Sequence, residues 1–138
     1  MSVYDTDGLF VRSFGEGTFK DATDITTAND GRVMVVEGSD SFCVHIFSED
    51  GVHLYNVNIQ GRIYWFPRIA FHRRSGSVVI AAKDEDLLHV EIFTKDGDFV
   101  RSTQIHEEGI DSVKGLTVTM DGQIALLLAG YKSKVLVI

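Results

Sequence analysis

The sequence predicts an all-β fold, a β-propeller made of four-stranded antiparallel blades. Three observations predict it. Two kinds of glycine turn recur with one period along the 138 residues. Each period divides into short strands, of which the second is the most apolar, and no segment has the 3.6-residue periodicity of an amphipathic helix. About four strands per 40 to 50 residues is typical of a propeller blade, so we expect three blades in one domain.

The repeat is visible in the turns. An acidic turn that ends in glycine occurs at residues 4–8, 46–51 and 92–97, and its glycines are 43 and 46 residues apart. A second series of turns ends at Gly31, Gly76 and Gly122, which are 45 and 46 residues apart. The tetrapeptide Phe-Val-Arg-Ser follows the acidic turn at residues 10–13 and again at 99–102. Two independent markers with one period indicate a true internal repeat.

The elements follow in order from these turns. Residues 9–14 come after the first acidic turn and are therefore predicted to be a fourth strand that lacks a blade of its own. In the first blade, about residues 20–58, residues 32–37 form a continuous apolar run typical of a strand buried on both faces. The predicted strands of that blade are residues 24–28, 32–37, 43–47 and 53–57. The second blade, about residues 66–105, has predicted strands at residues 67–72, 77–82, 88–94 and 99–104. The third blade, about residues 114–138, has only three, at residues 115–119, 123–129 and 134–138.

The Asp-Gly pairs predict tight hairpins between the third and fourth strands. A type I′ turn needs a positive φ at both central residues, and Asp-Gly suits that requirement. We therefore expect type I′ turns at these positions.

The missing strand predicts an assembly. Propellers have about four to eight blades, so three blades leave apolar faces and strand edges uncovered. Two copies would give a six-bladed ring, in which residues 9–14 of each chain complete the third blade of the other. We expect an obligate homodimer closed by N-terminal strand exchange. The alternatives are a monomer of unusual curvature and a fragment excised from a longer chain.

The turn pattern resembles that of NHL repeats. A phenylalanine, an acidic residue with glycine, a second phenylalanine and a serine, followed by a further turn and an apolar strand, is similar to the NHL blade. Residues 66–70 (Phe-Pro-Arg-Ile-Ala) resemble its opening. Where the family has Val-x-Asp after the second strand, this chain has Glu37, Ala82 and Lys83, and Leu128. The likeness is strongest to the C-terminal domains of tripartite-motif (TRIM-NHL) proteins.

That resemblance implies a six-bladed propeller that recognises protein or RNA beside a ubiquitin-ligase half. No RING or B-box cysteine pattern is present, so we expect no ligase chemistry in this chain. WD repeats fit less well, because the sequence has no Gly-His or Trp-Asp signature. Amidating lyases share the NHL-like fold and hold a metal at the central axis, which leaves an enzyme as an alternative.

The residues themselves predict no catalytic set, metal site or cofactor. The five histidines form no ligand-spaced pair, and Cys43 has no Cys-x-x-Cys partner. His45 and His89 are expected to be outward-facing residues of the third strands. Residues 15–20 lack the third glycine of a phosphate loop, and the acidic residues at 5–8 and 84–86 are expected to be solvated turns without calcium.

The predicted binding face is the end of the ring that carries the fourth-to-first and second-to-third strand loops. Its candidate residues are Arg62, Tyr64, Trp65, Arg68, Lys83, Tyr131 and Lys132. Basic residues among aromatic ones are also what RNA binding uses, so an RNA-binding domain is an alternative. The net charge of −7 opposes a polyanion, and Arg73 and Arg74 are expected at the opposite end.

The remaining composition excludes several classes. A single cysteine forms no internal disulfide, and 44% hydrophobic with 24% charged residues is typical of a folded chain. The sequence has no run of about 18 apolar residues and no signal peptide in its first residues. We therefore expect a cytoplasmic, non-enzymatic recognition module without a membrane partner. A half-propeller scaffold without a ligand, excised or engineered, is the other alternative.

Overall fold

The computed structural model describes residues 1–38, 42–58, 65–85 and 87–138, and it contains strands but no helix in these residues. The strands are β1 (Ser2–Tyr4), β2 (Phe10–Ser13), β3 (Ala22–Thr27), β4 (Val33–Glu37), β5 (Cys43–Phe47), β6 (His53–Asn58), β7 (Trp65–His72), β8 (Ser77–Asp84), β9 (Leu87–Thr94), β10 (Phe99–His106), β11 (Ile110–Val118), β12 (Ile124–Gly130) and β13 (Lys134–Val137).

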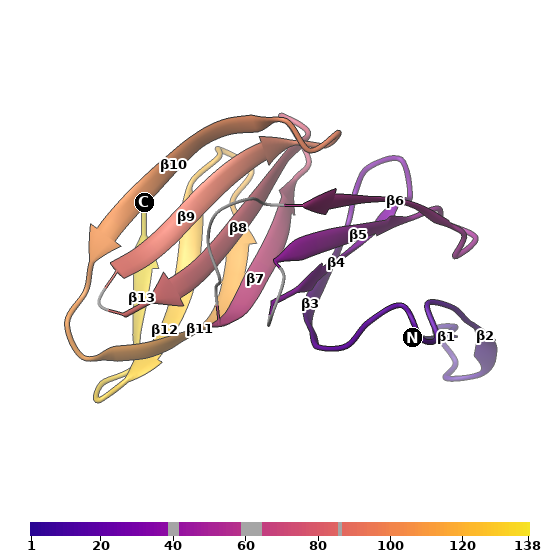
Figure 1. Cartoon of the computed structure of the whole chain (residues 1–138), viewed down its shortest axis with the longest axis horizontal. Helices are drawn as coiled ribbons and strands as arrows, with labels where there is room; N and C mark the ends of the chain where they lie inside the picture. Colours follow the sequence, from indigo (N-terminus) through magenta and orange to yellow (C-terminus); the bar gives the residue numbers. More distant parts are fainter. Residues whose placement is uncertain (39–41, 59–64, 86) are drawn as a thin grey trace.

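The strands form four antiparallel sheets in which chain neighbours are also hydrogen-bonded neighbours. The N-terminal hairpin pairs β1 with β2. The first sheet has the order β3-β4-β5-β6, the second β7-β8-β9-β10 and the third β11-β12-β13. The three larger sheets stand side by side, and the hairpin lies at the far end beside the first sheet (Figure 1). The all-β prediction is confirmed.

The predicted strands of the three units are all present, with ends shifted by a few residues. β1 is not predicted from the sequence, because three residues are too few to show an alternating pattern. The predicted strand at residues 9–14 is β2, and it pairs with β1 of its own chain.

The predicted type I′ turns are wrong. Gly8, Gly51 and Gly97 have φ of 80°, 86° and 92°, whereas the aspartate before each glycine has no positive φ. In the last of these turns Gly97 N donates to Thr94 O and Thr94 N to Asp98 O, and the other two repeat that pattern. This is a type I turn closed by a glycine bulge, which needs positive φ at one residue only.

The hairpins after the third strands share one register. Tyr4 pairs with Phe10 and Val3 with Arg12, as Phe93 pairs with Phe99 and Ile92 with Arg101. The β5–β6 pairing has an irregularity at the same place, between Ile46 and Phe47. The sequence repeat is therefore also a repeat of backbone geometry.

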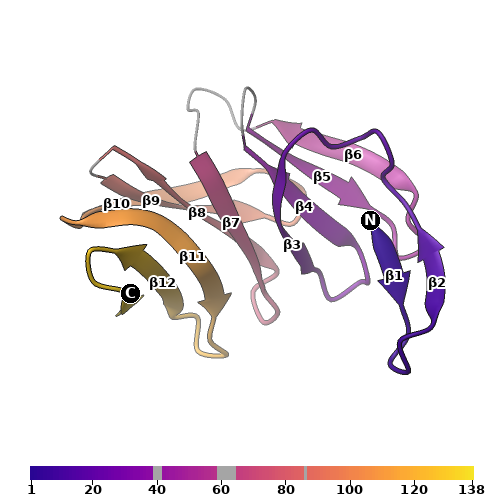
Figure 2. The same ribbon diagram turned by 90° about the horizontal axis from the view of Figure 1, so that it is seen from below.

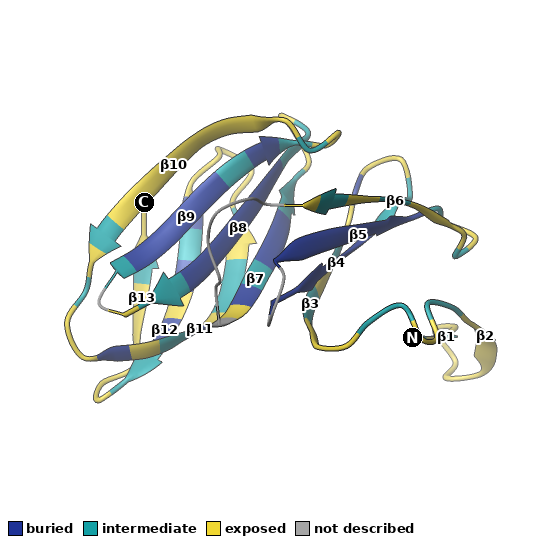
Figure 3. Cartoon of the chain, viewed as in Figure 1, coloured by how far each residue is buried: buried dark blue, intermediate teal, exposed yellow. Residues whose placement is uncertain are grey.

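Two hydrophobic cores lie between the sheets. The first joins the first and second sheets through side chains such as Met34, Ile46 and Ile80. The second joins the second and third sheets through residues such as Val79, Leu126 and Leu128. The middle strands β4, β5, β8 and β9 are the most deeply buried, and β10 is exposed along most of its length (Figure 3). The predicted apolar second strands thus fill the space between the sheets.

The first strands of the three sheets are neighbours. β7 contacts both β3 and β11 (Figure 2). Arg68 on β7 donates from Nη1 to Thr23 O at 2.9 Å and from Nε to Val113 O at 3.2 Å. Asp24 Oδ2 accepts the backbone N–H of Ile69 at 3.0 Å. One arginine therefore ties the first strands of all three sheets.

Candidate functional site

One end of the three sheets collects the connections that the sequence analysis nominated. We call it the linker end: among the described residues it comprises the starts of β3, β7 and β11, the segments 14–21 and 107–109 that lead into β3 and β11, the ends of β4 and β8, and the turn after β12. The glycine turns 28–32, 73–76 and 119–123 close the opposite end. Since the strands alternate in direction, this division follows from the topology alone.

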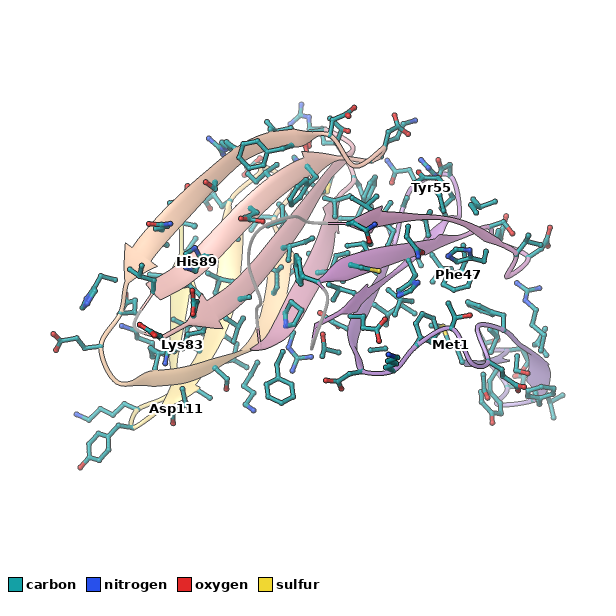
Figure 4. All side chains as sticks on the ribbon, in the orientation of Figure 1. Met1, Phe47, Tyr55, Lys83, His89 and Asp111 are labelled. Carbon is teal, nitrogen blue, oxygen red and sulfur yellow. The ribbon has the colours of Figure 1, made fainter. Side chains whose placement is uncertain are left out.

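The structure places several nominated residues at the linker end. Trp65, at the start of β7, pairs across the strands with Lys83 near the end of β8. Tyr131 and Lys132 follow β12 in the turn to β13, and Tyr131 is 94% exposed. Lys83 is labelled in the side-chain view, beside the turn that ends β8 (Figure 4). Arg62 and Tyr64 lie outside the described residues.

The Tyr131 turn is attached to the neighbouring connection. The backbone N–H of Tyr131 donates to Gly109 O at 3.0 Å. A Cβ on Gly130 would lie 1.9 Å from Gly109 O, so this close approach requires glycine at position 130. The exposed tyrosine is therefore presented on a fixed backbone.

Arg68 has a different environment from the other nominated residues. Its guanidinium is half-buried and bonded to two backbone carbonyls of β3 and β11. Those bonds give it a structural task at the line of first strands. A part in ligand binding stays a prediction.

The non-glycine residues of positive φ among the described residues both lie at this end. Phe66 has a φ of 52° in β7, and Glu85 has a φ of 48° in the turn after β8. Phe66 is 55% exposed, and the register of β7 against β8 is irregular between Trp65 and Arg68. A large side chain in the left-handed region is unusual and is found often at functional sites.

Arg73 and Arg74 lie at the opposite end, as the sequence analysis predicted. They line a groove of about 460 Å³ between the first and second sheets, together with Asp30, Lys95 and Asp96. Arg32 nearby is 2.9 Å from Asp30 and donates to Tyr55 Oη at 2.7 Å. Among the described residues, Lys83 and Lys132 therefore lie at the linker end, whereas Arg73, Arg74 and Lys95 lie at the opposite end beside Asp30 and Asp96.

Beneath the linker end of the first sheet is a buried polar cluster that the sequence analysis missed: Glu37, Cys43 and His45. Glu37 ends β4 and pairs directly with Cys43 at the start of β5. His45 lies two residues further along β5, and residues two apart point to one face of a sheet. The three side chains therefore share one face, the face opposite to the first hydrophobic core.

Both histidines that were expected to face outward are buried, although His45 does lie on the face opposite to the first hydrophobic core. His45 is 5% exposed and His89 4% exposed. Phe19, from the segment that leads into β3, packs edge-on against the His45 ring at 5.1 Å, and Phe47 lies against Phe14 and Phe19. Residues 14–21, which we call the linker segment, thus cover the outer face of the first sheet. The sequence pattern alone does not reveal this contact.

The cluster converges on one nitrogen. His45 Nε2 lies 2.8 Å from Glu37 Oε2 and 3.2 Å from Cys43 Sγ. The other carboxylate oxygen, Glu37 Oε1, accepts the backbone N–H groups of Lys20 at 2.6 Å and Asp21 at 2.9 Å. Glu37 therefore joins the β4–β5 pair to the linker segment.

The cluster sets the charge of its members. Burial acts to raise the pKa of the Glu37 carboxyl, but the hydrogen bonds from His45 and from the N–H groups of Asp21 and Lys20 outweigh it, and the pKa lies below its usual value. Burial raises the pKa of the Cys43 thiol, and the Glu37 charge adds to that effect. At neutral pH the cluster holds a carboxylate beside a neutral thiol.

This geometry differs from a nucleophilic relay. In such a relay the nucleophile contacts one ring nitrogen of histidine and the acid contacts the other. Here both contacts fall on Nε2, and Nδ1 has no hydrogen-bond partner among the described residues. A raised thiol pKa also lowers the fraction of the reactive thiolate at neutral pH. The arrangement brings three metal-ligand types together, with all three ligand atoms within 4.8 Å of one another.

The equivalent positions of the other sheets do not repeat this set. Ala82 pairs with His89 as Glu37 pairs with Cys43, and Leu128 pairs with Lys134. The sequence does contain one signal of the cluster, because Cys43 and His45 are two residues apart and Glu37 stands opposite Cys43 on the neighbouring strand. It was hidden because recognising it requires the β4–β5 register.

Comparison with known proteins does not assign the chain to a family. No family model matches this chain, and no curated protein matches it. Among the described residues no helix is both long and apolar enough to cross a bilayer.

Proposed function

We propose that this chain is half of an NHL-type β-propeller, which closes into a six-bladed ring with a second copy and recognises partners through the linker end. Support for the propeller comes from the repeated four-stranded meanders and the neighbouring first strands β3, β7 and β11. In a propeller the first strands surround the axis, and the sheets pack face to face around it.

The observation that carries the proposal is the uncovered outer face of the third sheet. It is apolar: Leu127 is 47%, Val135 67% and Val137 52% exposed. A shallow apolar groove of about 400 Å³ runs over it, lined by Gly115, Leu116, Thr117, Ala125, Leu126, Leu127 and Val135. A contiguous exposed apolar surface indicates an interaction site. Neighbouring sheets within the chain bury such apolar faces against each other. A further sheet of the same kind would cover the exposed face of the third sheet in the same way.

Closure by strand exchange requires one rearrangement. Relative to β2, β1 occupies the position of a third strand, since the Tyr4–Phe10 pair repeats the Phe93–Phe99 pair. β13 is also a third strand and has a free edge. The partner's β13 therefore pairs with β2 only after β1 leaves that edge. The N-terminal hairpin has few covering contacts, since Tyr4, Leu9, Phe10 and Val11 are all more than half exposed.

Recognition, rather than catalysis, is supported by the linker end. It presents exposed Tyr131, Phe66 and Lys132 on backbone held by hydrogen bonds and positive φ. The Glu37–Cys43–His45 cluster lacks relay geometry and carries a neutral thiol. A protein partner suits this surface better than RNA, because the chain has a net charge of −7 and the basic residues are divided between two ends.

Binding by the linker end is tested by paired variants. Tyr131→Ala with Lys132→Ala removes the exposed turn side chains, and Arg73→Ala with Arg74→Ala alters the opposite end to a similar extent. We expect proteins cross-linked to the wild type in cells to be lost with the first pair and kept with the second. Equal capture by both pairs would contradict the choice of face.

A gel-shift titration with single-stranded and structured RNA distinguishes the RNA-binding alternative from recognition of a protein. We expect no binding at 100 mM salt. Salt-sensitive binding that is weakened by Arg68→Lys or Lys83→Ala, but kept by the Arg73 and Arg74 variants, would favour the RNA-binding alternative instead.

A further inference from the structure

We propose that Glu37, Cys43 and His45 form a structural site for a divalent transition metal ion, with zinc as the ion that fits best. The inference is independent of ring closure and of the recognition face. It rests on the identity, spacing and surroundings of three side chains within the first sheet.

The ligand set suits zinc. Thiolate, imidazole and carboxylate are the three side-chain types that bind Zn²⁺, and a thiolate disfavours magnesium and calcium. All three residues are at least nine-tenths buried: Glu37 is 7%, Cys43 6% and His45 5% exposed. Three protein ligands with water in the fourth position are a common zinc arrangement.

The spacing is close to what the ion requires. Zinc–ligand bonds of about 2.0 to 2.3 Å in a tetrahedron put the ligand atoms about 3.3 to 3.6 Å apart. In the structure His45 Nε2 is 3.2 Å from Cys43 Sγ and 2.8 Å from Glu37 Oε2. For these two pairs the separation has to grow by about half an ångström or less to admit the ion, and all three ligand atoms lie within 4.8 Å of one another.

The backbone positions the ligands. Glu37 and Cys43 are a directly opposed pair across β4 and β5, and His45 is on the same face two residues later. Strands locate side chains more rigidly than loops do, which favours a preorganised site.

Two backbone N–H groups hold the Glu37 carboxylate in place. Glu37 Oε1 is held by the backbone N–H groups of Lys20 and Asp21, which leaves Oε2 directed at His45. Hydrogen bonds to the non-coordinating atom of a ligand are a regular feature of metal sites. A bound ion would replace the proton of the Cys43 thiol, because a coordinating thiol is deprotonated outright.

The consequence of binding would be structural. Glu37 links the β4–β5 pair to residues 20 and 21, so an ion held by Glu37, Cys43 and His45 would fasten the linker segment to the outer face of the first sheet. This position lies under the linker end. A metal ion bound only by the folded chain stabilises it by mass action.

The test uses the full chain, stripped with a chelator and then titrated with Zn²⁺ in a calorimeter. We expect one ion per chain and a higher melting temperature with zinc. Cys43→Ser and His45→Ala should each weaken binding by at least about tenfold, a loss typical of damaged metal sites. His106→Ala, which removes an exposed histidine on β10, is the matched control and should bind as the wild type does.

Cobalt gives a second readout that does not depend on the variants folding. Wild-type chain with Co²⁺ should show the near-ultraviolet charge-transfer band of a thiolate ligand and the visible bands of a tetrahedral ion. No zinc binding at micromolar concentration, cobalt binding without the thiolate band, or unchanged affinity in Cys43→Ser would overturn the proposal. The trio would then be a hydrogen-bonded cluster only.

Discussion

At the scale of single residues, the structure depends on a few positions at which one side chain or its absence joins sheets. Arg68 spans three first strands with two hydrogen bonds, and glycines in the third-to-fourth turns allow other segments to pack closely against them. Replacing such a residue should lower the free energy of unfolding more than replacing the equivalent residue elsewhere in the repeat. The repeat therefore supplies its own controls.

Gly97→Ala should destabilise the fold more than Gly8→Ala. Both glycines have positive φ in equivalent turns, so both variants carry the backbone cost of about 1 kcal/mol. A Cβ at residue 97 would lie 2.6 Å from Val57 Cγ2, whereas a Cβ at residue 8 meets nothing within 4 Å. We expect a further loss of about 1 to 3 kcal/mol at residue 97 from overpacking, measured by urea unfolding. Equal losses would contradict the packing of the turn on β6.

Arg68→Ala should lower the free energy of unfolding by about 2 to 4 kcal/mol. Two hydrogen bonds from a charged group are lost, and the carbonyls of Thr23 and Val113 lose their donor. Arg73→Ala, on an exposed turn, should change it by less than about 0.5 kcal/mol. Chemical denaturation of both variants checks this. An Arg68→Ala variant as stable as Arg73→Ala would show that the hydrogen bonds of Arg68 to β3 and β11 do not stabilise the fold.

At the scale of elements, the sequence was most informative where burial and turn chemistry agree. The apolar runs and the glycine turns that precede them located β4, β8 and β12 with their hairpins, because both signals are local. β1 was missed because three residues carry no period. The buried His45 was missed because the segment that covers it comes from residues 14–21, and nothing in β5 itself records that contact.

The difference between local and non-local signals also decides which residues of the candidate site can be predicted from the sequence. Tyr131, Lys132 and Lys83 could be assigned to one end from strand direction alone, which is fixed by the number of turns. The Glu37–Cys43–His45 cluster could not, since it depends on a register in which residues 37 and 43 stand opposite each other. Register needs the length and geometry of the intervening turn.

Charges on the outer face of the third sheet should block self-association. Val135→Lys with Val137→Lys places two ammonium groups on the surface that we propose a second copy covers. Burying an unpaired charge in a desolvated interface is costly, so we expect the dimer dissociation constant to rise by more than about a hundredfold. Val100→Lys with Phe99→Lys, on exposed β10, is the control for added charge and lost apolar surface. Analytical ultracentrifugation of both pairs measures the effect, and equal weakening would point to non-specific association.

Removal of residues 1–14 should abolish closure while leaving the three larger sheets folded. β2 is the strand proposed to complete the partner's third sheet, and it makes no strand pairing with the first sheet in the single chain. The circular dichroism of the truncated chain should keep its β signal as the mass falls to that of one chain. A truncated chain that still dimerises would leave apolar burial, and not strand exchange, as the basis of assembly.

At the scale of the whole molecule, three sheets pack on one another through two cores and leave the outer apolar face of the third without cover. The ring that we propose, of which one chain supplies half, would account together for the number of sheets, the neighbouring first strands and that open face. A six-bladed ring would bring two linker ends to one surface and double every candidate contact, including Tyr131 and Lys132.

The measurement that tests this account most directly is the mass of the chain in solution, by light scattering across a concentration series that extends below 1 µM. One chain has a mass of 15.3 kDa. We predict twice that mass throughout the micromolar range, with dissociation only on dilution or in the Val135 and Val137 variants. A mass of one chain at 100 µM would contradict the ring, because the apolar face of the third sheet would then be stable in water without a second copy.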